Sequence, residues 1–146
     1  MSYNQVDILL IEDNLHEAEL TIRNLKKHNL ANRLLHIDDG ADALEYIFAR
    51  GKYVGESRVN PRLILLDLKL PRVDGLEILR QVKSNEITKT IPVVILTSSR
   101  EEKDIVESYR IGVNSYIVKP VSFDAFALAI KELGLYWMIL NQSPEL

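Results

Sequence analysis

The sequence predicts an α/β domain in which a parallel five-stranded sheet, with strand order 2-1-3-4-5, is covered by helices on both faces. Short runs that are almost wholly apolar alternate along the chain with longer segments whose apolar residues recur at helical spacing. This pair of patterns occurs five times. Strands buried on both faces and joined by helices form parallel sheets, and the right-handed crossover rule leaves few possible strand orders. The order 2-1-3-4-5, a flavodoxin-like three-layer sandwich, is a common one.

Local signals place each element in turn. The strands are expected at 6–11, 34–37, 63–66, 92–96 and 115–118. The helices are expected at 15–28, 41–50, 76–85, 100–111 and from 122 onward. Pro92 fits only at the start of a strand, Gly112 ends a helix, and Ser122 is a good helix N-cap. One serine of Ser98 and Ser99 is expected to cap the helix at 100–111.

The apolar positions of the first two helices each fall on one face. They are Ala18, Ile22 and Leu25 in the first helix, and Ala43, Leu44, Ile47 and Phe48 in the second. Residues 51–60 contain two glycines, show no periodicity and precede a proline, which predicts a loop. Its simplest interpretation is a tolerated surface insertion.

Composition narrows the class of protein. The chain has 146 residues, 47% of them hydrophobic and 27% charged, so we expect a single domain over 1–146. The absence of cysteine excludes disulfides and thiolate metal sites and fits a reducing compartment. A net charge of -3 argues against a nucleic-acid-binding surface. No apolar run is long enough to span a membrane and no signal-peptide pattern begins the chain, so a cytoplasmic location is expected.

Polar side chains follow four of the five predicted strands. Glu12 and Asp13 follow the first strand, Asp67 the third, Thr97 the fourth and Lys119 the fifth. Parallel strands place their C-terminal ends on one edge, and the first and third strands meet at the point where such folds bind ligands. Each residue has a simpler interpretation as a turn residue, a helix cap or a solvated lysine. Because all of them suit one reaction at one edge, the functional interpretation is favoured.

The predicted cluster suits phosphoryl transfer. Three neighbouring carboxylates repel one another, and a hard divalent cation such as Mg²⁺ compensates this repulsion through carboxylate oxygens while keeping open positions. Those positions can take a phosphoryl group. Lys119 adds a point charge for a phosphate oxygen, Thr97 adds a donor, and one carboxylate can act as the nucleophile.

With these residues in place, the sequence resembles the receiver domain of two-component response regulators over about residues 5–133. The motifs occur in the family's order and are highly specific together. The matching residues are Glu12-Asp13, Asp39-Gly40-x-x-Ala43-Leu44, Asp67-x-x-Leu70-Pro71-x-x-Asp74-Gly75, Thr97, Tyr116 and Lys119-Pro120.

The resemblance implies a role for each site residue. Asp67 accepts a phosphoryl group from a histidine kinase, and Lys119 pairs with the phosphoryl oxygens. Mg²⁺ is held by Glu12, Asp13, Asp67 and the backbone carbonyl of Lys69. Thr97 and Tyr116 act as the switch that responds to the aspartyl phosphate. The protein would not be an enzyme beyond self-catalysed phosphoryl acceptance and slow autodephosphorylation.

Three positions depart from the commonest family pattern. Glu12 stands where an aspartate is commoner, and its longer side chain is expected to reach a metal either directly or through a water molecule. Lys69 lies two residues after the phosphoacceptor, and Ser99 lies two residues after Thr97. A cation at Lys69 can slow or redirect hydrolysis of the aspartyl phosphate. The side chain of Ser99 can also alter the rate of that hydrolysis.

The C-terminal residues 134–146 form an apolar extension. Residues 135–140 are six consecutive large apolar residues, which cover every side of a helix, so we expect an interface at Tyr136, Trp137, Ile139 and Leu140. The alternative is a last helix folded wholly onto its own core. This ending and the loop at 51–60 resemble the small stand-alone response regulators that partner phytochromes. That resemblance implies a homodimer through the fourth helix, fifth strand and fifth helix, and a light-sensing histidine kinase as partner.

Three other classes of protein share part of this pattern. A haloacid-dehalogenase-type phosphatase needs a second Asp two residues after Asp67, where this chain has Lys69. A flavodoxin-like cofactor binder needs a phosphate-cradling loop after the first strand, where this chain has the acidic Glu12-Asp13-Asn14. A receiver-like protein-binding module that is never phosphorylated stays open as the alternative. No downstream domain follows in this sequence, so output through a protein contact is expected.

Overall fold

The structure is a computed structural model, and it describes residues 6–27, 33–55, 60–119 and 122–132, without the side chains of residues 123 and 130. The strands are β1 (Ile8–Ile11), β2 (Leu34–Ile37), β3 (Leu63–Leu66), β4 (Val93–Thr97) and β5 (Ser115–Val118). The helices are α1 (Leu15–Lys27), α2 (Gly40–Ile47), the 3-10 helix η2 (Gly51–Tyr53), α3 (Gly75–Ser84), α4 (Glu102–Ile111) and α5 (Phe123–Glu132). Among the described helices, none has the length and apolar content that a bilayer crossing requires.

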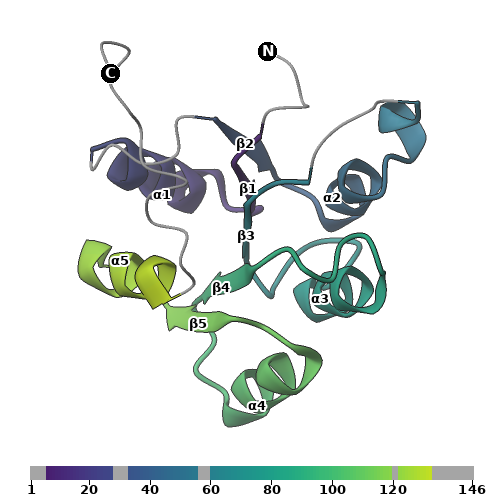
Figure 1. Cartoon of the computed structure of the whole chain (residues 1–146). Helices are drawn as coiled ribbons and strands as arrows, with labels where there is room; N and C mark the ends of the chain where they lie inside the picture. The colour runs from purple at the N-terminus through teal and green to yellow at the C-terminus, as the bar shows by residue number, and fades with distance from the viewer. Residues whose placement is uncertain (1–5, 28–32, 56–59, 120–121, 133–146) are drawn as a thin grey trace.

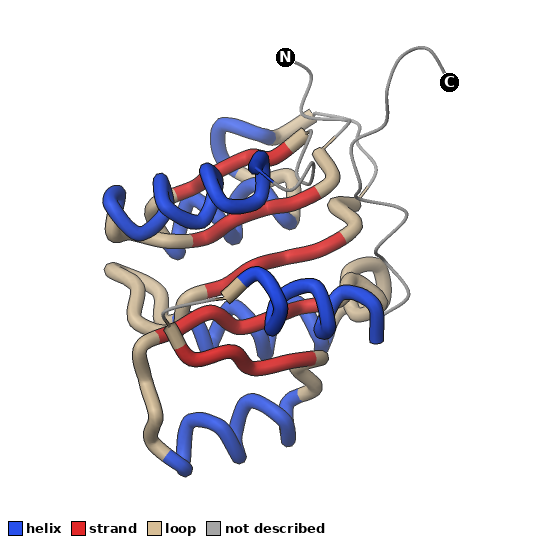
Figure 2. Tube along the Cα trace, turned by 90° about the vertical axis from the view of Figure 1, so that its left-hand side faces the viewer, coloured by secondary structure: helices blue, strands red, loops and turns tan. Residues whose placement is uncertain are grey.

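The five strands form one parallel sheet in the order β2-β1-β3-β4-β5, which confirms the predicted fold. In the register of the sheet, Ile11 lies between Ile37 and Leu66, so β1, β2 and β3 end level with one another. Figure 1 shows α1 and α5 on one side of the sheet and α2 and α3 on the other, and Figure 2, with the side of α1 and α5 toward the viewer, shows the strands running alongside one another behind these helices. The C-terminal ends of the strands therefore share one open edge.

Alternate residues of the central strands feed two separate cores. Leu9 and Ile64 belong to the larger core, beneath α2 and α3, whereas Ile8 and Leu63 belong to the smaller core, beneath α1 and α5. β1 and β3 are buried along their whole length, as strands covered on both faces should be. Each fully buried Leu or Ile contributes roughly 1.5–3 kcal/mol, so these strands form the rigid centre of the domain.

Two predicted helix boundaries are wrong. The second helix ends at Ile47 rather than at residue 50, because Ala49 takes a positive φ of 53°, which an α-helix cannot contain. The fourth helix begins at Glu102 with Glu101 as its N-cap, and no side chain caps it there. Neither Ser98 nor Ser99 is that cap, and the hydroxyl of Ser99 donates instead to Asp104 Oδ2. Ser122, by contrast, caps α5 as expected, accepting from the Ala125 N–H at 3.1 Å.

The loop predicted at 51–60 is more ordered at its start than the sequence suggests. Gly51–Tyr53 form η2, and the Tyr53 side chain is only 7% exposed. Its ring meets that of Tyr46 edge-on at 5.3 Å between centroids, within the larger core. Residues 56–59 lie outside the described part of the chain. The segment that follows α2 is therefore anchored through Tyr53 by an aromatic pair, while its neighbours in the segment stay exposed.

Replacing Tyr53 by alanine is expected to lower the free energy of unfolding by about 3 kcal/mol, because it removes a buried ring and leaves a cavity beside Tyr46. Urea unfolding followed by circular dichroism measures this loss. Val54→Ala is the matched control, since Val54 is 73% exposed and should change stability by less than about 0.5 kcal/mol. Equal effects of the two substitutions would show that η2 is a surface insertion.

Candidate functional site

The predicted site residues converge because backbone hydrogen bonds of the sheet continue past the strand ends. The Glu12 N–H donates to Ile37 O at 3.1 Å, and the Asp67 N–H donates to Ile11 O at 3.0 Å. At the other side of the sheet, the Lys119 N–H donates to Thr97 O at 2.8 Å. Each of these three side chains thus starts from a backbone position that is hydrogen-bonded to a neighbouring strand.

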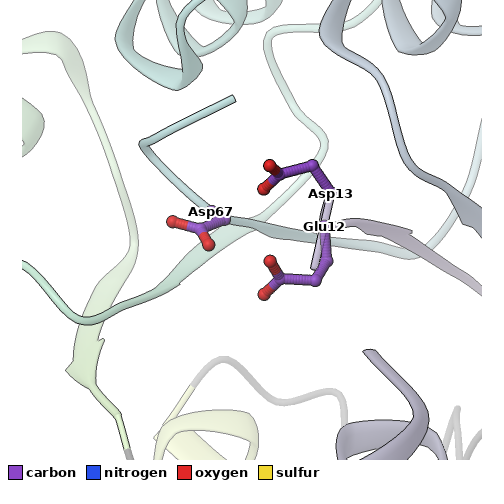
Figure 3. A group of neighbouring side chains, drawn as sticks. All are labelled: Glu12, Asp13 and Asp67. Carbon is purple, nitrogen blue, oxygen red and sulfur yellow. The ribbon is translucent and has the colours of Figure 1, made fainter. Parts of the chain in front are cut away.

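Three carboxylates form the acidic part of the site. Glu12, Asp13 and Asp67 each offer one oxygen, and these oxygens all lie within 4.8 Å of one another. Figure 3 shows the three side chains pointing into a common space. Glu12 and Asp67 are buried, with 3% and 8% exposure, whereas Asp13 lies on the exposed side. An incoming ion or phosphoryl group can therefore reach the cluster from the side of Asp13.

Lys119 neutralises the buried part of this cluster. Its ammonium donates to Glu12 Oε1 and, at 3.1 Å, to Asp67 Oδ2. Its side chain is 8% exposed, and Glu17 Oε2 lies 3.4 Å from the same nitrogen. Sequence reasoning missed Glu17, because its position on α1 reads only as an acidic residue in a first helical turn. The lysine is thus a bridge between two strand ends rather than a solvated side chain.

Burial and charge act in opposition on these groups. Burial raises the pKa of Glu12, the neighbouring Asp67 charge raises it further, and the hydrogen bond from Lys119 opposes both, which leaves the pKa at about 7. Burial alone would lower the pKa of Lys119, but its hydrogen bond to Glu12 and the charge of Asp67 raise that pKa above the ordinary value. Lys119 therefore stays charged at neutral pH.

The turn after β3 brings the backbone close to Asp67. Asp74 caps α3 by accepting from the Leu76 N–H at 3.3 Å. A Cβ on Gly75 would lie 2.4 Å from Asp67 O and 2.6 Å from Leu68 Cα, so only glycine fits at that position. The Lys69 N–H in turn donates to Asp67 Oδ1 at 3.2 Å. The Lys69 N–H, in the same connection between β3 and α3, thus fixes one oxygen of the Asp67 carboxylate.

Thr97 and Tyr116 both contact Ser99 in the loop between β4 and α4. The Ser99 N–H approaches Thr97 Oγ1 at 3.4 Å, and the Tyr116 hydroxyl donates to Ser99 O at 3.1 Å. Thr97 is buried with 1% exposure, and Tyr116 is partly buried. Burial raises the pKa of Tyr116, the hydrogen bond to Ser99 opposes this, and the charges of Asp104 and Asp67 add to the rise.

Other predicted and observed residues lie apart from the acidic cluster. The Lys69 ammonium extends away to Asp104 Oδ2, 3.7 Å distant, and Asp104 is a buried residue that the sequence analysis did not identify. The role of the Lys69 carbonyl as a ligand stays a prediction. The predicted interface residues Tyr136, Trp137, Ile139 and Leu140 lie outside the described part of the chain.

A further ion pair, which we call the rim ion pair, joins Asp39 after β2 to Arg72 after β3. Arg72, from the turn after β3, donates through Nε to Asp39 Oδ1 at 2.9 Å and through a terminal nitrogen to Asp39 Oδ2. Asp39 is also the N-cap of α2, where it accepts from the Asp42 N–H at 2.9 Å. The hydrogen bond from Arg72 holds the pKa of Asp39 below its ordinary value, against a smaller opposing effect of burial.

The family follows from comparison with known proteins. The model of the response regulator receiver domain matches residues 8–131. The chain belongs to the response regulator receiver family. Receiver domains are in general signalling modules rather than enzymes, they bind Mg²⁺ or Mn²⁺ at an acidic pocket, and they work with histidine kinases.

Two curated relatives match most of this chain and most of their own length. One is the probable methanogenesis regulatory protein FilR2 of Methanothrix harundinacea, 41% identical over 94% of this chain and 86% of its own length. The other is the response regulator Rcp1 of Synechocystis, 36% identical over 90% of this chain and 88% of its own length.

Solved structures of response regulators share the fold. The bacteriophytochrome response regulator AtBRR is 50% identical, with a TM-score of 0.82 over 94% of this chain and 98% of its own. The Mn(2+)-bound form of Rcp1 is 34% identical, with a TM-score of 0.75 over 96% of this chain and 99% of its own. The phosphorylated cyanobacterial phytochrome response regulator RcpA is 36% identical, with a TM-score of 0.75 over 92% of this chain and 94% of its own.

The rim ion pair predicts a change in acid stability. Because the folded pKa of Asp39 lies below its ordinary value of 3.8, its contribution to stability is present above that pH and is lost as the pH falls through the folded pKa. Arg72→Met should therefore raise the pKa of Asp39 toward 3.8 and destabilise the protein at pH 7 more than at pH 2. Carbon-detected NMR titration of the Asp39 carboxyl group and urea unfolding at both pH values measure this.

Lys52→Met is the control for the rim, since Lys52 lies 3.8 Å from Asp42 but is not among the groups that set the pKa of Asp39. Asp39 should titrate in this variant as in the wild type. An unchanged Asp39 titration in Arg72→Met would contradict the assignment of the lowered pKa to this ion pair.

Proposed function

We propose that the chain accepts a phosphoryl group on Asp67 from a histidine kinase. The observation that carries this proposal is the bridge of Lys119 between two buried carboxylates at the carboxyl edge of a parallel sheet. An ion pair that only stabilised the fold would not need a third carboxylate exposed to solvent. Asp13 supplies that third carboxylate on the open side, where a partner can approach.

The transfer is a single exchange at phosphorus. An oxygen of Asp67 forms a bond to the phosphorus of a phosphohistidine, and the bond from phosphorus to the ring nitrogen breaks with its electron pair staying on that nitrogen. The ring nitrogen then takes a proton from solvent. Lys119, already 3.1 Å from Asp67 Oδ2, is positioned to pair with a phosphoryl oxygen. The Lys69 N–H holds the other carboxylate oxygen and orients the group.

The donor set fits a hard divalent cation. Glu12, Asp13 and Asp67 provide carboxylate oxygens, which Mg²⁺ prefers, and the carbonyl of Lys69 is the fourth proposed ligand. When bound, Mg²⁺ would offset the charge of the carboxylates and of the phosphoryl oxygens. The acidic pocket and the Mn²⁺-bound form of Rcp1 support this part of the proposal. Slow autodephosphorylation would complete the cycle.

A groove beside the site offers a place for the kinase. A cavity of about 390 Å³ lies between α1 and α5, and Leu20, Leu96, Phe126 and Lys119 are among its lining residues. Because Lys119 lines the groove and also contacts Asp67, a helix seated there would bring its phosphohistidine near the acceptor. The similarity to bacteriophytochrome and cyanobacterial phytochrome response regulators supports a phytochrome as that kinase.

The output would be a protein contact. Thr97 and Tyr116, which meet at Ser99, form the proposed switch. Val106 and Tyr109 on α4 and Leu128 on α5 are more than half exposed, and these apolar side chains fit a homodimer through α4, β5 and α5. Tyr136, Trp137, Ile139 and Leu140 would extend this interface.

Incubation with acetyl phosphate and Mg²⁺ should add one phosphoryl mass to the wild-type protein and none to Asp67→Asn, because the amide is not a nucleophile for phosphorus. Intact-mass spectrometry at neutral pH measures both. Asp13→Asn should weaken labelling at low Mg²⁺ because it removes one ligand. Labelling of Asp67→Asn would place the acceptor elsewhere, and no labelling of the wild type would favour an unphosphorylated binding module.

Trp137→Ala should weaken self-association if the apolar extension is an interface, since tryptophan side chains often carry much of the binding energy of an interface. Sedimentation velocity over a range of protein concentrations measures this, with and without acetyl phosphate. Gln142→Ala, a polar position in the same segment, is the control. An unchanged association of Trp137→Ala would instead favour an extension folded onto its own domain.

A further inference from the structure

The buried side chains of helix α4 are polar, and its Ile111 packs against the larger core only partly buried. Its buried residues are Asp104 and Ser108, whereas those of α3 include Ile78, Leu79 and Val82. Asp104 is only 6% exposed, which is unusual for a carboxylate unless it is paired. The contacts of Asp104 therefore help to determine how α4 is held.

Ser99 is the main partner of Asp104. Its hydroxyl donates to Asp104 Oδ2 at 2.6 Å, a short distance typical of a charge-assisted hydrogen bond. The same serine accepts from the Tyr116 hydroxyl through its carbonyl and approaches Thr97 through its N–H. One residue thus joins α4 to both proposed switch residues.

Lys69 is the second partner. Its ammonium lies 3.7 Å from the same oxygen, Asp104 Oδ2, and its side chain is 68% exposed. Its backbone N–H meanwhile donates to Asp67 Oδ1. Lys69 therefore connects the acceptor carboxylate to α4, through a main-chain contact at one end and an ion pair at the other.

The two partners of Asp104 differ in strength. The hydrogen bond from Ser99 is short and its acceptor is buried, whereas exposed ion pairs contribute little and are easily exchanged. Lys69 is thus the partner that a new negative charge can remove. A phosphoryl group on Asp67 would be such a charge, two residues away along the chain.

We infer that Asp104 is a positioning residue that holds the Lys69 side chain away from Asp67 and releases it when Asp67 is phosphorylated. We call Asp104, Ser99 and Lys69 the Asp104 clasp. This inference rests on the proposed phosphorylation of Asp67. Release of Lys69 would weaken the attachment of α4 and at the same time place an ammonium beside the phosphoryl oxygens.

The released lysine should slow loss of the phosphoryl group. In hydrolysis, water attacks phosphorus, the bond from phosphorus to the Asp67 oxygen breaks, and the products are the carboxylate, inorganic phosphate and a proton. A Lys69 ammonium lying over the phosphoryl oxygens obstructs the approach of that water. Asp104 therefore sets the lifetime by competing for Lys69, without touching the reacting atoms.

Asp104→Asn tests this competition while keeping an acceptor for Ser99. Its phosphoryl half-life, measured by intact mass after removal of acetyl phosphate, should be about two- to fivefold longer than that of the wild type, the range of a surface ion pair. Glu102→Gln is the matched control, because it removes an exposed carboxylate from the same first turn of α4 and should leave the half-life unchanged. Equal lengthening in both variants would assign the effect to the helix charge and overturn the clasp.

The double substitution isolates the role of Lys69. In a Lys69→Gln background, Asp104→Asn should no longer change the half-life, because the competing ammonium is gone. A purely structural role of Asp104 would give the same change in both backgrounds and would overturn the inference.

Hydrogen exchange of the α4 amides separates this inference from the proposed function. In the unmodified proteins, Asp104→Asn and Lys69→Gln should each exchange faster than Glu102→Gln by about two- to fivefold. Absence of wild-type labelling would contradict phosphorylation of Asp67, and the exchange rates would still test the clasp. Rates in both variants equal to that of Glu102→Gln would overturn it.

Discussion

The ammonium of Lys119 is the interaction on which the rest of the site depends. Glu12 and Asp67 are buried side by side, and two like charges about 4 Å apart repel by roughly 4 kcal/mol at the dielectric of a protein surface. Lys119 contacts both carboxylates, so two attractions of similar size oppose one repulsion. Burial first, and then the charge of Asp67, raise the pKa of Glu12 against the hydrogen bond from Lys119, and a further cation would favour the charged form of this carboxylate.

The place of the site follows from the way the strands are buried. β1 and β3 are apolar along their whole length, so a charged group can enter only where a strand ends. Ladder hydrogen bonds to Ile37 and Ile11 hold Glu12 and Asp67 just beyond those ends. The central strands thus hold the two carboxylates together against their repulsion. Gly75 lets the next helix begin against the backbone of Asp67.

The sequence predicts the fold and the acidic cluster well, because both depend on patterns that are local in the chain. β3 is found at the predicted residues, and the positions of Asp67 and Lys119 follow from the strand order. Contacts between particular side chains that lie outside the periodic patterns were not predictable in this way. Tyr53 looked like part of a loop until its ring was placed against Tyr46, and Asp104 looked like an ordinary acidic residue in a first helical turn. Neither residue carries a periodic signal that reveals its partner.

The difference between α3 and α4 explains which element can respond to the site. α3 buries several aliphatic side chains at roughly 1.5–3 kcal/mol each, a total that a change in surface charge cannot offset. The buried residues of α4 are Asp104 and Ser108, and Ile111 packs against the larger core only partly buried. Asp104 is held by a hydrogen bond from Ser99, which at a charged acceptor contributes about 1.5–3 kcal/mol, whereas the Ser108 hydroxyl bonds to Asp104 O within the helix. A phosphoryl group alters electrostatic energies by amounts of that size. Under the proposed phosphorylation of Asp67, the new charge can therefore move α4 while β3 and α3 keep Asp67 in place, which is what a switch built on a rigid site requires.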